Sequence, residues 1–351
     1  MSKWLLCSAR SIRRLLLSGL RASGTFERVA DSKWRSQRLL ILCYHGVSLY
    51  DEHECYPELF VTKEFLRRRF EILKNKGYAV LPLGDAIHQL RRSILPPRSV
   101  ALTFDDGFYN FLSVAVPILQ EFGFPATNYV SSYYAIKQRP ILGLTLKYLV
   151  WCARDRGVPP NLMAGQENVV DLRCLQQRNT VTENLLNCAL ELENDKAAQL
   201  DWMEMTAKQL GVDWNMIMKN RLFHLLSPDE IAETSNKGFD IQLHTHRHRT
   251  PRNKDEFFGE ILENRRILER YSGRPAVHFC YPSGDFDAKF LPWLRELDVA
   301  SATTGISSLA RANDDPLLLP RYIDTMAQPE VIFESWLSGV AELTSPRFPS
   351  V

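Results

Sequence analysis

Two adjacent carboxylates, Asp105 and Asp106, follow a short apolar run that begins at Ser99 and precede Gly107. This pattern predicts a buried strand that ends at the carboxylates, a turn, and then a helix over 111–122. Chemistry in α/β folds sits at the C-terminal ends of strands. One carboxylate there can hold a divalent cation while its neighbour takes a proton from water. The alternative is that the pair only caps the following helix.

A histidine-rich segment, His244-Thr245-His246-Arg247-His248, follows a second apolar run much further along the chain. His244 and His248 are four residues apart, so a helical turn would place both imidazoles on one face, with His246 pointing elsewhere. Two neutral imidazoles and one carboxylate make a three-ligand site with open positions for water and substrate. Zn²⁺ is the default ion for this donor set, and Co or Ni also suit it. A solvated loop is the alternative.

The elements that must position these residues alternate between strands and helices. A capping box at Ser227 to Glu230 starts one helix, which Gly238 ends. The alternation indicates βα units and a parallel sheet or barrel. Strands are expected at 39–44, 78–81, 99–104, 126–130, 240–243, 277–280, 299–303 and 317–323, and further helices at 60–76, 83–90, 255–271, 286–297 and 330–340.

The alternation breaks near Lys137. From about 138 to about 223, apolar residues recur at helical spacing without clustered histidines or carboxylates, which predicts a helical insertion. Its tryptophans, Trp151, Trp202 and Trp214, could pack in the core or line a sugar-binding surface. The predicted organisation is therefore an N-terminal segment (1–38) and a barrel-like domain (39–340) that carries this insertion.

Composition is that of an ordinary soluble globular protein. The 351 residues are 45% hydrophobic and 24% charged, and the net charge of +2 does not indicate a nucleic-acid partner. The seven cysteines are odd in number, widely scattered and without a CxxC pair. This usage argues against a disulfide scaffold and favours a reducing compartment.

Residues 1–38 are strongly basic, with nine Lys or Arg and two acidic residues, which leaves a charge of +7. Leucines and isoleucine lie among these charges, so the segment predicts a basic amphipathic helix suited to an anionic membrane surface. An extra helix packed on the domain or a disordered leader are the alternatives. Arg10, Arg13 and Arg14 interrupt any signal-peptide core, so a cytoplasmic or peripherally membrane-associated location is expected.

Four segments of the chain together resemble the polysaccharide deacetylases of the NodB-homology type (carbohydrate esterase family 4). TFDDG (103–107) is similar to the family's first motif, and His244-Thr245-x-x-His248 is similar to its second. LCYHGV (42–47) and FCYPSG (279–284) also look like family segments. The resemblance covers about 39–325 apart from the insertion. It implies a distorted (β/α) barrel that removes acetyl groups, with N-deacetylation expected first, from a polysaccharide or glycan.

The resemblance also implies residue roles. Asp106, His244 and His248 would hold the metal, and Asp105 would be the general base that deprotonates the attacking water. A backbone N–H near Tyr281 could share the charge of the tetrahedral oxyanion.

The sequence differs from the family pattern at the position expected to supply the general acid. Many members supply a histidine near the last strand, where this chain has Leu317-Leu318-Leu319-Pro320-Arg321. His45, at the end of the first strand, is the best substitute, because imidazole ionises near neutral pH. The alternative for His45 is a purely structural role. Arg321 could instead orient Asp105 and keep it ionised.

Three other functions stay open at this stage. A catalytically impaired carbohydrate-binding protein on a deacetylase scaffold fits the missing late histidine, although both aspartates and both histidines are present. Another metal-dependent amidohydrolase fits His244-x-His246, although those barrels carry this motif on an early strand. A sugar transferase could use the paired aspartates, but no Gly-rich or basic phosphate cradle accompanies them.

Overall fold

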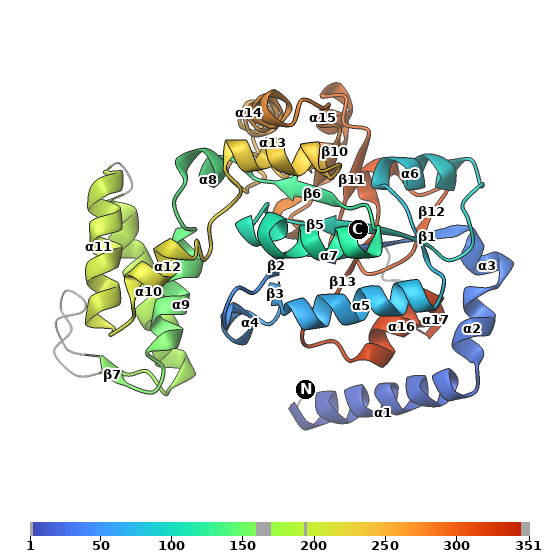
Figure 1. Ribbon diagram of the computed structural model, residues 1–351, viewed down its shortest axis with the longest axis horizontal. Coiled ribbons are helices and arrows are strands. Elements are labelled where there is room, and N and C mark those ends of the chain that lie inside the picture. Colours follow the sequence, from blue (N-terminus) through green and yellow to red (C-terminus); the bar gives the residue numbers. More distant parts are fainter. Residues whose placement is uncertain (1–2, 159–169, 193–194, 345–351) are drawn as a thin grey trace.

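The computed structural model describes residues 3–158, 170–192 and 195–344. Within these residues, nine strands form one sheet: β1 (Arg38–Tyr44), β4 (Ala79–Val80), β5 (Ser99–Phe104), β6 (Thr127–Val130), β9 (Asp240–Leu243), β10 (His278–Cys280), β11 (Ser301–Thr303), β12 (Ala310–Arg311) and β13 (Tyr322–Ile323). Their order is β11-β10-β9-β6-β5-β1-β12, with β4 beside β5 and β13 beside β1 (Figure 1). Neighbouring strands run parallel, except that β12 is antiparallel to β1.

The segment from Leu319 to Ile323 joins the two ends of this sheet. The N–H of Leu319 donates to the carbonyl of Ala302 in β11 at 2.9 Å, and the N–H of Thr304 donates back to the carbonyl of Leu319 at 2.9 Å. A few residues later, β13 pairs with β1, which is next to the last strand at the opposite end of the strand order. The sheet therefore curls into a distorted barrel, and the predicted α/β barrel fold is confirmed.

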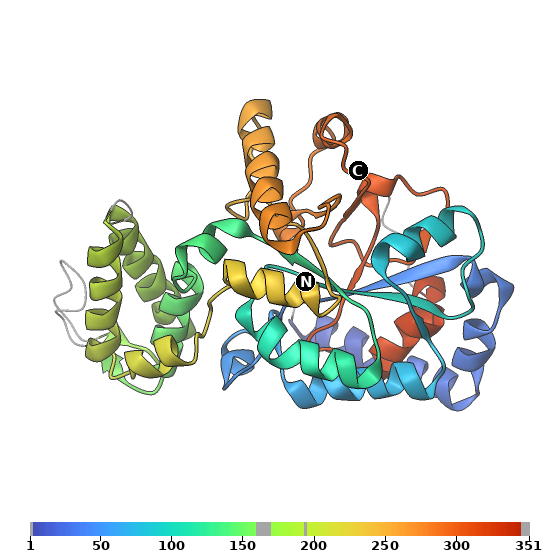
Figure 2. The ribbon, with the colours of Figure 1, turned by 45° about the horizontal axis from the view of Figure 1, so that its top comes forward.

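Helices surround this sheet in both views (Figures 1 and 2). Their ends follow local sequence signals, because Thr62 accepts a hydrogen bond from the N–H of Phe65, and Ser227 with Glu230 forms the predicted capping box. The helices are α4 (Glu52–Cys55), α5 (Lys63–Asn75), α6 (Leu83–Arg91), α7 (Val116–Phe122), α13 (Pro228–Asn236), α14 (Lys254–Ser272), α15 (Phe290–Glu296), α16 (Glu330–Ser338) and α17 (Val340–Thr344).

Several predicted elements differ in the structure. The helix expected at 286–297 is shorter, Phe290–Glu296, and the strand expected at 299–303 begins at Ser301. The helix expected at 60–76 begins at Lys63, because Phe60–Val61 forms a strand, β3, that pairs with β2 (Gly46–Val47). The strand expected at 317–323 is a 3-10 turn, Pro316–Leu318, followed by the short β13. The helix expected at 111–122 opens with a π-helical turn, Phe111–Ala115, before α7.

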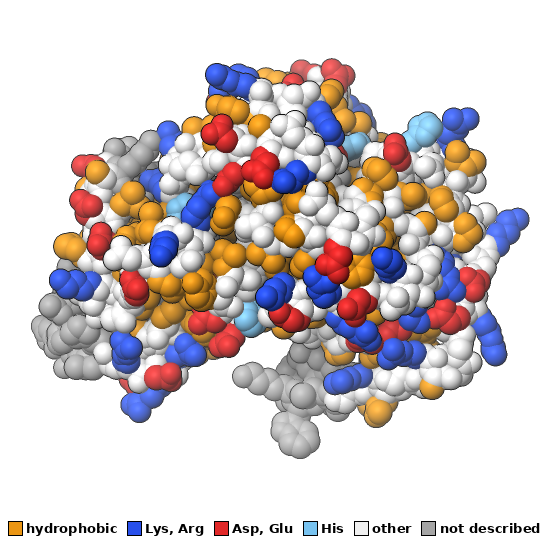
Figure 3. Space-filling view, in the orientation of Figure 1, with side chains coloured by type: hydrophobic (Ala, Val, Ile, Leu, Met, Phe, Trp, Pro, Cys, Tyr) orange, Lys and Arg blue, Asp and Glu red, His pale blue; other side chains and the backbone are white. Residues whose placement is uncertain are grey.

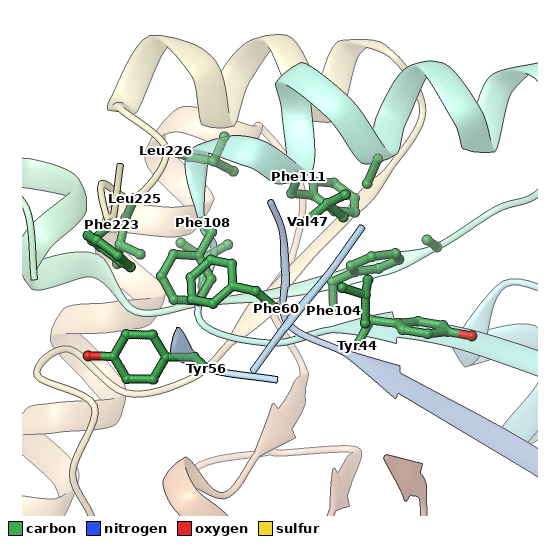
Figure 4. Packing of buried hydrophobic residues seen from close by; sticks show 14 of the residues in the cluster. Tyr44, Val47, Tyr56, Phe60, Phe104, Phe108, Phe111, Phe223, Leu225 and Leu226 are labelled. Atoms are coloured by element: carbon green, nitrogen blue, oxygen red, sulfur yellow. The ribbon is translucent and has the colours of Figure 1, made fainter. Parts of the chain in front are cut away.

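An aromatic core packs beneath the strands that end at the carboxylates (Figure 4). The ring centroids of Phe104 and Phe111 are 4.9 Å apart, and those of Phe60 and Phe108 are 5.0 Å apart. Phe223 lies against Phe60 at 5.8 Å and brings the end of the helical segment into the same core. The core therefore fixes the strand ends relative to the helices that follow them.

The chain between β6 and β9 is mostly helical, although these two strands pair directly with each other. Both views show the helices of residues 142–219 gathered to one side of the sheet (Figures 1 and 2). Trp214 is buried there, and Trp151 and Trp202 pack against the core. Residues 159–169 and 193–194 of the predicted insertion lie outside the described residues. The elements are α8 (Ser132–Lys137), α9 (Leu142–Cys152), β7 (Gly157–Val158), β8 (Val170–Asp171), α10 (Leu175–Glu191), α11 (Lys196–Gln209) and α12 (Trp214–Lys219).

Three helices precede the barrel: α1 (Lys3–Ala22), α2 (Thr25–Ala30) and α3 (Lys33–Ser36). Leu17 of α1 and Phe26 of α2 are buried in a small cluster with Val331 and Val340. Side chains of residues 1–10 lie outside the described part of the chain. Among the residues that are described, no helix combines the length and apolar character that crossing a membrane requires.

The turn that follows the carboxylates is tightly packed at Gly107. Its φ is +83°, and an added Cβ would lie 2.6 Å from a methyl group of Val130. Gly123 has a similar φ of +70° but no atom within 4 Å of such a Cβ. We expect Gly123→Ala to lower the free energy of unfolding by about 1–2 kcal/mol from backbone strain alone. Gly107→Ala should lose about 1–3 kcal/mol more because of the clash.

Urea denaturation of the two variants measures this difference. Equal losses for Gly107→Ala and Gly123→Ala would show that contact with Val130 does not constrain the turn.

Candidate active site

The polar residues predicted from the sequence meet at one edge of the sheet. His45 follows β1, Asp105 and Asp106 follow β5, and His244 follows β9, while Arg321 directly precedes β13. Because these strands are parallel, the C-terminal ends of β1, β5 and β9 lie at the same edge. Arg321 reaches Asp105 at this edge from the start of β13. The structure therefore brings together side chains that are far apart in the sequence.

One group of three side chains has the arrangement of a metal site. Oδ1 of Asp106 lies 3.2 Å from Nε2 of His244 and 3.1 Å from Nε2 of His248. The side chain of His244 is buried, whereas that of His248 is 38% exposed. The three ligand atoms therefore converge at a place that a substrate can reach.

The loop that carries the histidines is not the predicted helical turn. Thr245 and His248 have φ values of +60° and +55°, which bend the chain so that both imidazoles reach Asp106. The buried carboxylate of Glu260 in α14 holds this loop by accepting from the N–H of Arg247 at 2.7 Å. His246 points elsewhere, as expected, with Nδ1 2.9 Å from the hydroxyl of Ser132.

The hydrogen bond made by the other ring nitrogen of His244 suits the binding of a divalent cation. Nδ1 of His244 lies 2.9 Å from the carbonyl oxygen of Cys280, which can only accept, so Nδ1 carries the proton. This tautomer leaves the lone pair of Nε2 directed toward Asp106. One carboxylate and two imidazoles thus offer ionised and neutral donors of the kind that Zn²⁺ and similar ions accept.

Asp105 forms a bidentate ion pair with Arg321. Nη1 of Arg321 donates to Oδ1 at 2.7 Å, and Nη2 donates to Oδ2 at 2.8 Å. Both side chains are buried. Burial raises the pKa of Asp105, but the charge and hydrogen bonds of Arg321 outweigh it, so the pKa lies well below its ordinary value. Asp105 is therefore ionised and fixed in orientation.

Two thiols that the sequence analysis did not single out also contact Asp105. Sγ of Cys43 lies 3.5 Å from its Oδ2, and Sγ of Cys280 lies 3.3 Å from the same atom. Burial raises the pKa of both thiols well above the ordinary value, so they are protonated and donate weakly to the carboxylate. Their position in the sequence offered a signal, because Cys43 is the second-to-last residue of β1 and Cys280 is the last residue of β10.

The same side chains form two other groups of possible ligands, Cys43 with His45 and Asp105, and Asp105 with His244 and Cys280. Protonated thiols are poor ligands, because the thiolate is the form that binds metals. Both oxygens of Asp105 are also engaged by Arg321. Asp106 with the two histidines is therefore the better group.

His45 stands beside Asp105 rather than bonding to it. Its Nε2 lies 3.8 Å from Oδ2 of Asp105, beyond hydrogen-bonding distance, and its side chain is 19% exposed. The imidazole thus lies at the site and remains accessible from solvent.

The expectation that a backbone N–H near Tyr281 shares the charge of an oxyanion stays a prediction, and the structure shows where the donors of Tyr281 itself point. Its backbone N–H donates to the carbonyl of Thr303 at 3.3 Å as part of the pairing between β10 and β11, and its hydroxyl donates to the carbonyl of Leu317 at 3.0 Å. Both donors of Tyr281 are therefore engaged within the barrel wall.

Comparison with known proteins gives a family match. A family model described as polysaccharide deacetylase matches residues 92–161 and 196–302, about half of the chain. The poly-beta-1,6-N-acetyl-D-glucosamine N-deacetylase of Escherichia coli K12 is 32% identical over 100 residues, which are 28% of this chain. The match spans only 14% of that relative's length.

Solved structures share the fold at low sequence identity. The Streptococcus pyogenes deacetylase PplD, solved in complex with acetate, has a TM-score of 0.56 and 18% identity, covering 88% of this chain and 99% of its own. IcaB from Ammonifex degensii has a TM-score of 0.53 and 16% identity, covering 86% and 97%. A polysaccharide deacetylase from Bacillus cereus has a TM-score of 0.53 and 17% identity, covering 86% and 69%.

Metal analysis tests the ligand group. We expect the purified protein to hold about one divalent ion per chain, and His244→Ala or His248→Ala to lose it, because each variant removes one of three donors. His246→Ala is the matched control, since its imidazole lies on the same loop but faces Ser132, and it should retain the metal. Elemental analysis by mass spectrometry gives the occupancy. Full occupancy in both ligand variants would contradict the assignment.

Proposed function

The chain belongs to the polysaccharide deacetylase family, and on that premise we propose that it is a metal-dependent hydrolase that removes N-acetyl groups from an acetylated polysaccharide or glycan. The observation that best supports the proposal is that the two adjacent carboxylates have different partners. Asp106 faces two histidines, while the adjacent Asp105 is kept ionised by Arg321. This division supports one carboxylate as a ligand and the other as a base.

The metal would be held by Asp106, His244 and His248, with Zn²⁺ as the first choice and Co or Ni as alternatives. A divalent ion bound there supplies Lewis-acid chemistry, polarising the acetyl carbonyl and making a nearby water more acidic. The chain's own residues then have to orient the acetamide and move two protons.

Asp105 takes the first proton, from the water that attacks the acetyl carbon. A carboxylate oxygen can accept more than one hydrogen bond, so Oδ1 of Asp105, which accepts from Nη1 of Arg321, can also accept from water. Arg321 fixes the direction of the carboxylate and favours its ionised form. It is a positioning residue, because its guanidinium acts through Asp105.

The second proton must reach the departing amine, which leaves poorly unless it is protonated. Arg321 cannot supply this proton at ordinary pH. The two ligand histidines turn their Nε2 atoms toward Asp106. His45 lies beside Asp105 and is partly exposed, so we assign it as the general acid.

The proposed domain organisation is a barrel domain at 39–340 with a helical insertion at about 138–223. The direct pairing of β6 with β9 supports this division, because the sheet continues across the segment. The proposed N-terminal segment, 1–38, contains the helices α1 to α3, which pack against the barrel domain, and its last residue, Arg38, begins β1.

Acetate release from a panel of N-acetylated glycans, including poly-β-1,6-N-acetylglucosamine, tests the function. Asp105→Asn should retain the metal but lose at least ~100-fold in rate, the scale for a positioned proton-transfer group. Asp287→Asn removes a carboxylate from a surface loop and should leave the rate unchanged. If the wild type with bound metal released no acetate, or if Asp105→Asn matched its rate, the proposal would fail.

His45 has a separate test that compares two leaving groups. His45→Ala should keep the fold and the metal but lose about 100-fold or more on acetamides. O-acetyl esters should lose less, because an alkoxide needs less help to depart than an amine. His53→Ala is the control, since this histidine contacts Ser48 outside the site. Equal losses on amides and esters, or no loss on amides, would place the acid elsewhere.

A further inference from the structure

Helix α1 presents apolar side chains to solvent. Ile12, Leu15 and Leu16 are 65%, 73% and 56% exposed, whereas Leu17 is fully buried against α16. In a helix, residues 12, 15, 16 and 19 share the side that lies opposite residue 17. Gly19 on this outer side has no atom within 4 Å of an added Cβ. Hydrophobic atoms protrude at the lower edge of the molecule, where α1 runs (Figure 3).

Contacts on the opposite side of α1 fix the orientation of the helix, so its exposed apolar side chains face solvent. Nη2 of Arg21 lies 2.6 Å from Oε1 of Glu334 and 3.3 Å from Oε1 of Glu330, both in α16. Together with burial of Leu17, these ion pairs turn a charged side of α1 toward the barrel domain. Surface helices ordinarily face the core with their apolar stripe and solvent with their charges. α1 thus keeps an apolar stripe, Ile12–Leu15–Leu16, on its outer side.

Charge indicates which partner covers this stripe. The segment Lys3–Ala22 contains five Lys or Arg and no acidic residue, and one of the five, Arg21, is engaged by Glu330 and Glu334 of α16. A second copy of the chain packed on the same stripe would bring two such helices together, and their like charges would repel. An anionic lipid surface attracts the basic residues and also accepts apolar side chains at the boundary between headgroups and acyl chains.

We propose that α1 docks the protein peripherally on an anionic membrane surface, with the Ile12–Leu15–Leu16 stripe inserted among the lipid headgroups. The long basic side chains can extend along the helix to the phosphates while the stripe is inserted. The proposal does not depend on the hydrolase function. It concerns where the protein resides, and it brings the barrel close to glycans that are attached to or assembled at the membrane.

Co-sedimentation of the full chain with vesicles tests the docking. We expect binding to vesicles of phosphatidylcholine with phosphatidylglycerol, weaker binding to phosphatidylcholine alone, and loss of binding at high salt. The triple variant Ile12→Ser, Leu15→Ser, Leu16→Ser should bind the anionic vesicles at least about tenfold more weakly. The control is Ile94→Ser with Leu343→Ser, which removes exposed apolar side chains elsewhere and should bind as the wild type does.

Two further measurements separate the outcomes. Acetate release from a soluble acetylated glycan should be equal in the wild type and the triple variant, so a failure of the hydrolase does not affect the vesicle result. Light scattering gives the oligomeric state. Equal vesicle binding by the triple variant, or no binding by the wild type, would overturn the proposal. So would a dimer that the triple variant abolishes, because the stripe would then be a self-interface.

Discussion

The buried ion pair between Arg321 and Asp105 links barrel closure to the site. Asp105 stands at the end of β5, and Arg321 belongs to the segment that joins β11 to β1. Such a pair adds little net stability, but loss of one partner leaves a buried charge and costs about 3–5 kcal/mol. Arg321 also donates to the carbonyl of Thr304 at 3.1 Å, so the guanidinium is fixed from two sides. The same contacts that close the wall therefore hold the carboxylate ionised and aimed.

Much of this arrangement could be predicted from local sequence. Each strand is a short apolar run bounded by turn residues, so the order of strands and helices can be predicted from the sequence. Asp105, Asp106 and His244 could be placed because they directly follow such runs. The capping box at Ser227 was likewise visible, since it depends only on neighbouring residues. Features whose physical cause is local are the ones that the sequence predicts well.

The remaining features depend on contacts between distant residues. His248 reaches Asp106 through a loop with positive φ at non-glycine residues, a conformation that residue type disfavours and that Glu260 on a distant helix supports. Cys43 and Cys280 look like ordinary strand residues, and only the fold turns their thiols toward one carboxylate. The sequence could not show that the donors of Tyr281 are engaged, because its partners Thr303 and Leu317 lie on other segments.

The closing segment, Leu319–Ile323, also has a consequence for the order of folding. Its pairing with β1 joins residues nearly the whole chain apart, and such non-local contacts form slowly because a large loop must be closed first. During synthesis, β1 emerges long before its last partner, β13. Until Arg321 arrives, Asp105 has no cation to oppose its burial, and its end of the sheet stays open. A chain that has emerged only as far as β11 therefore lacks both the closing strand and the cation that holds Asp105, so its catalytic centre is unfinished.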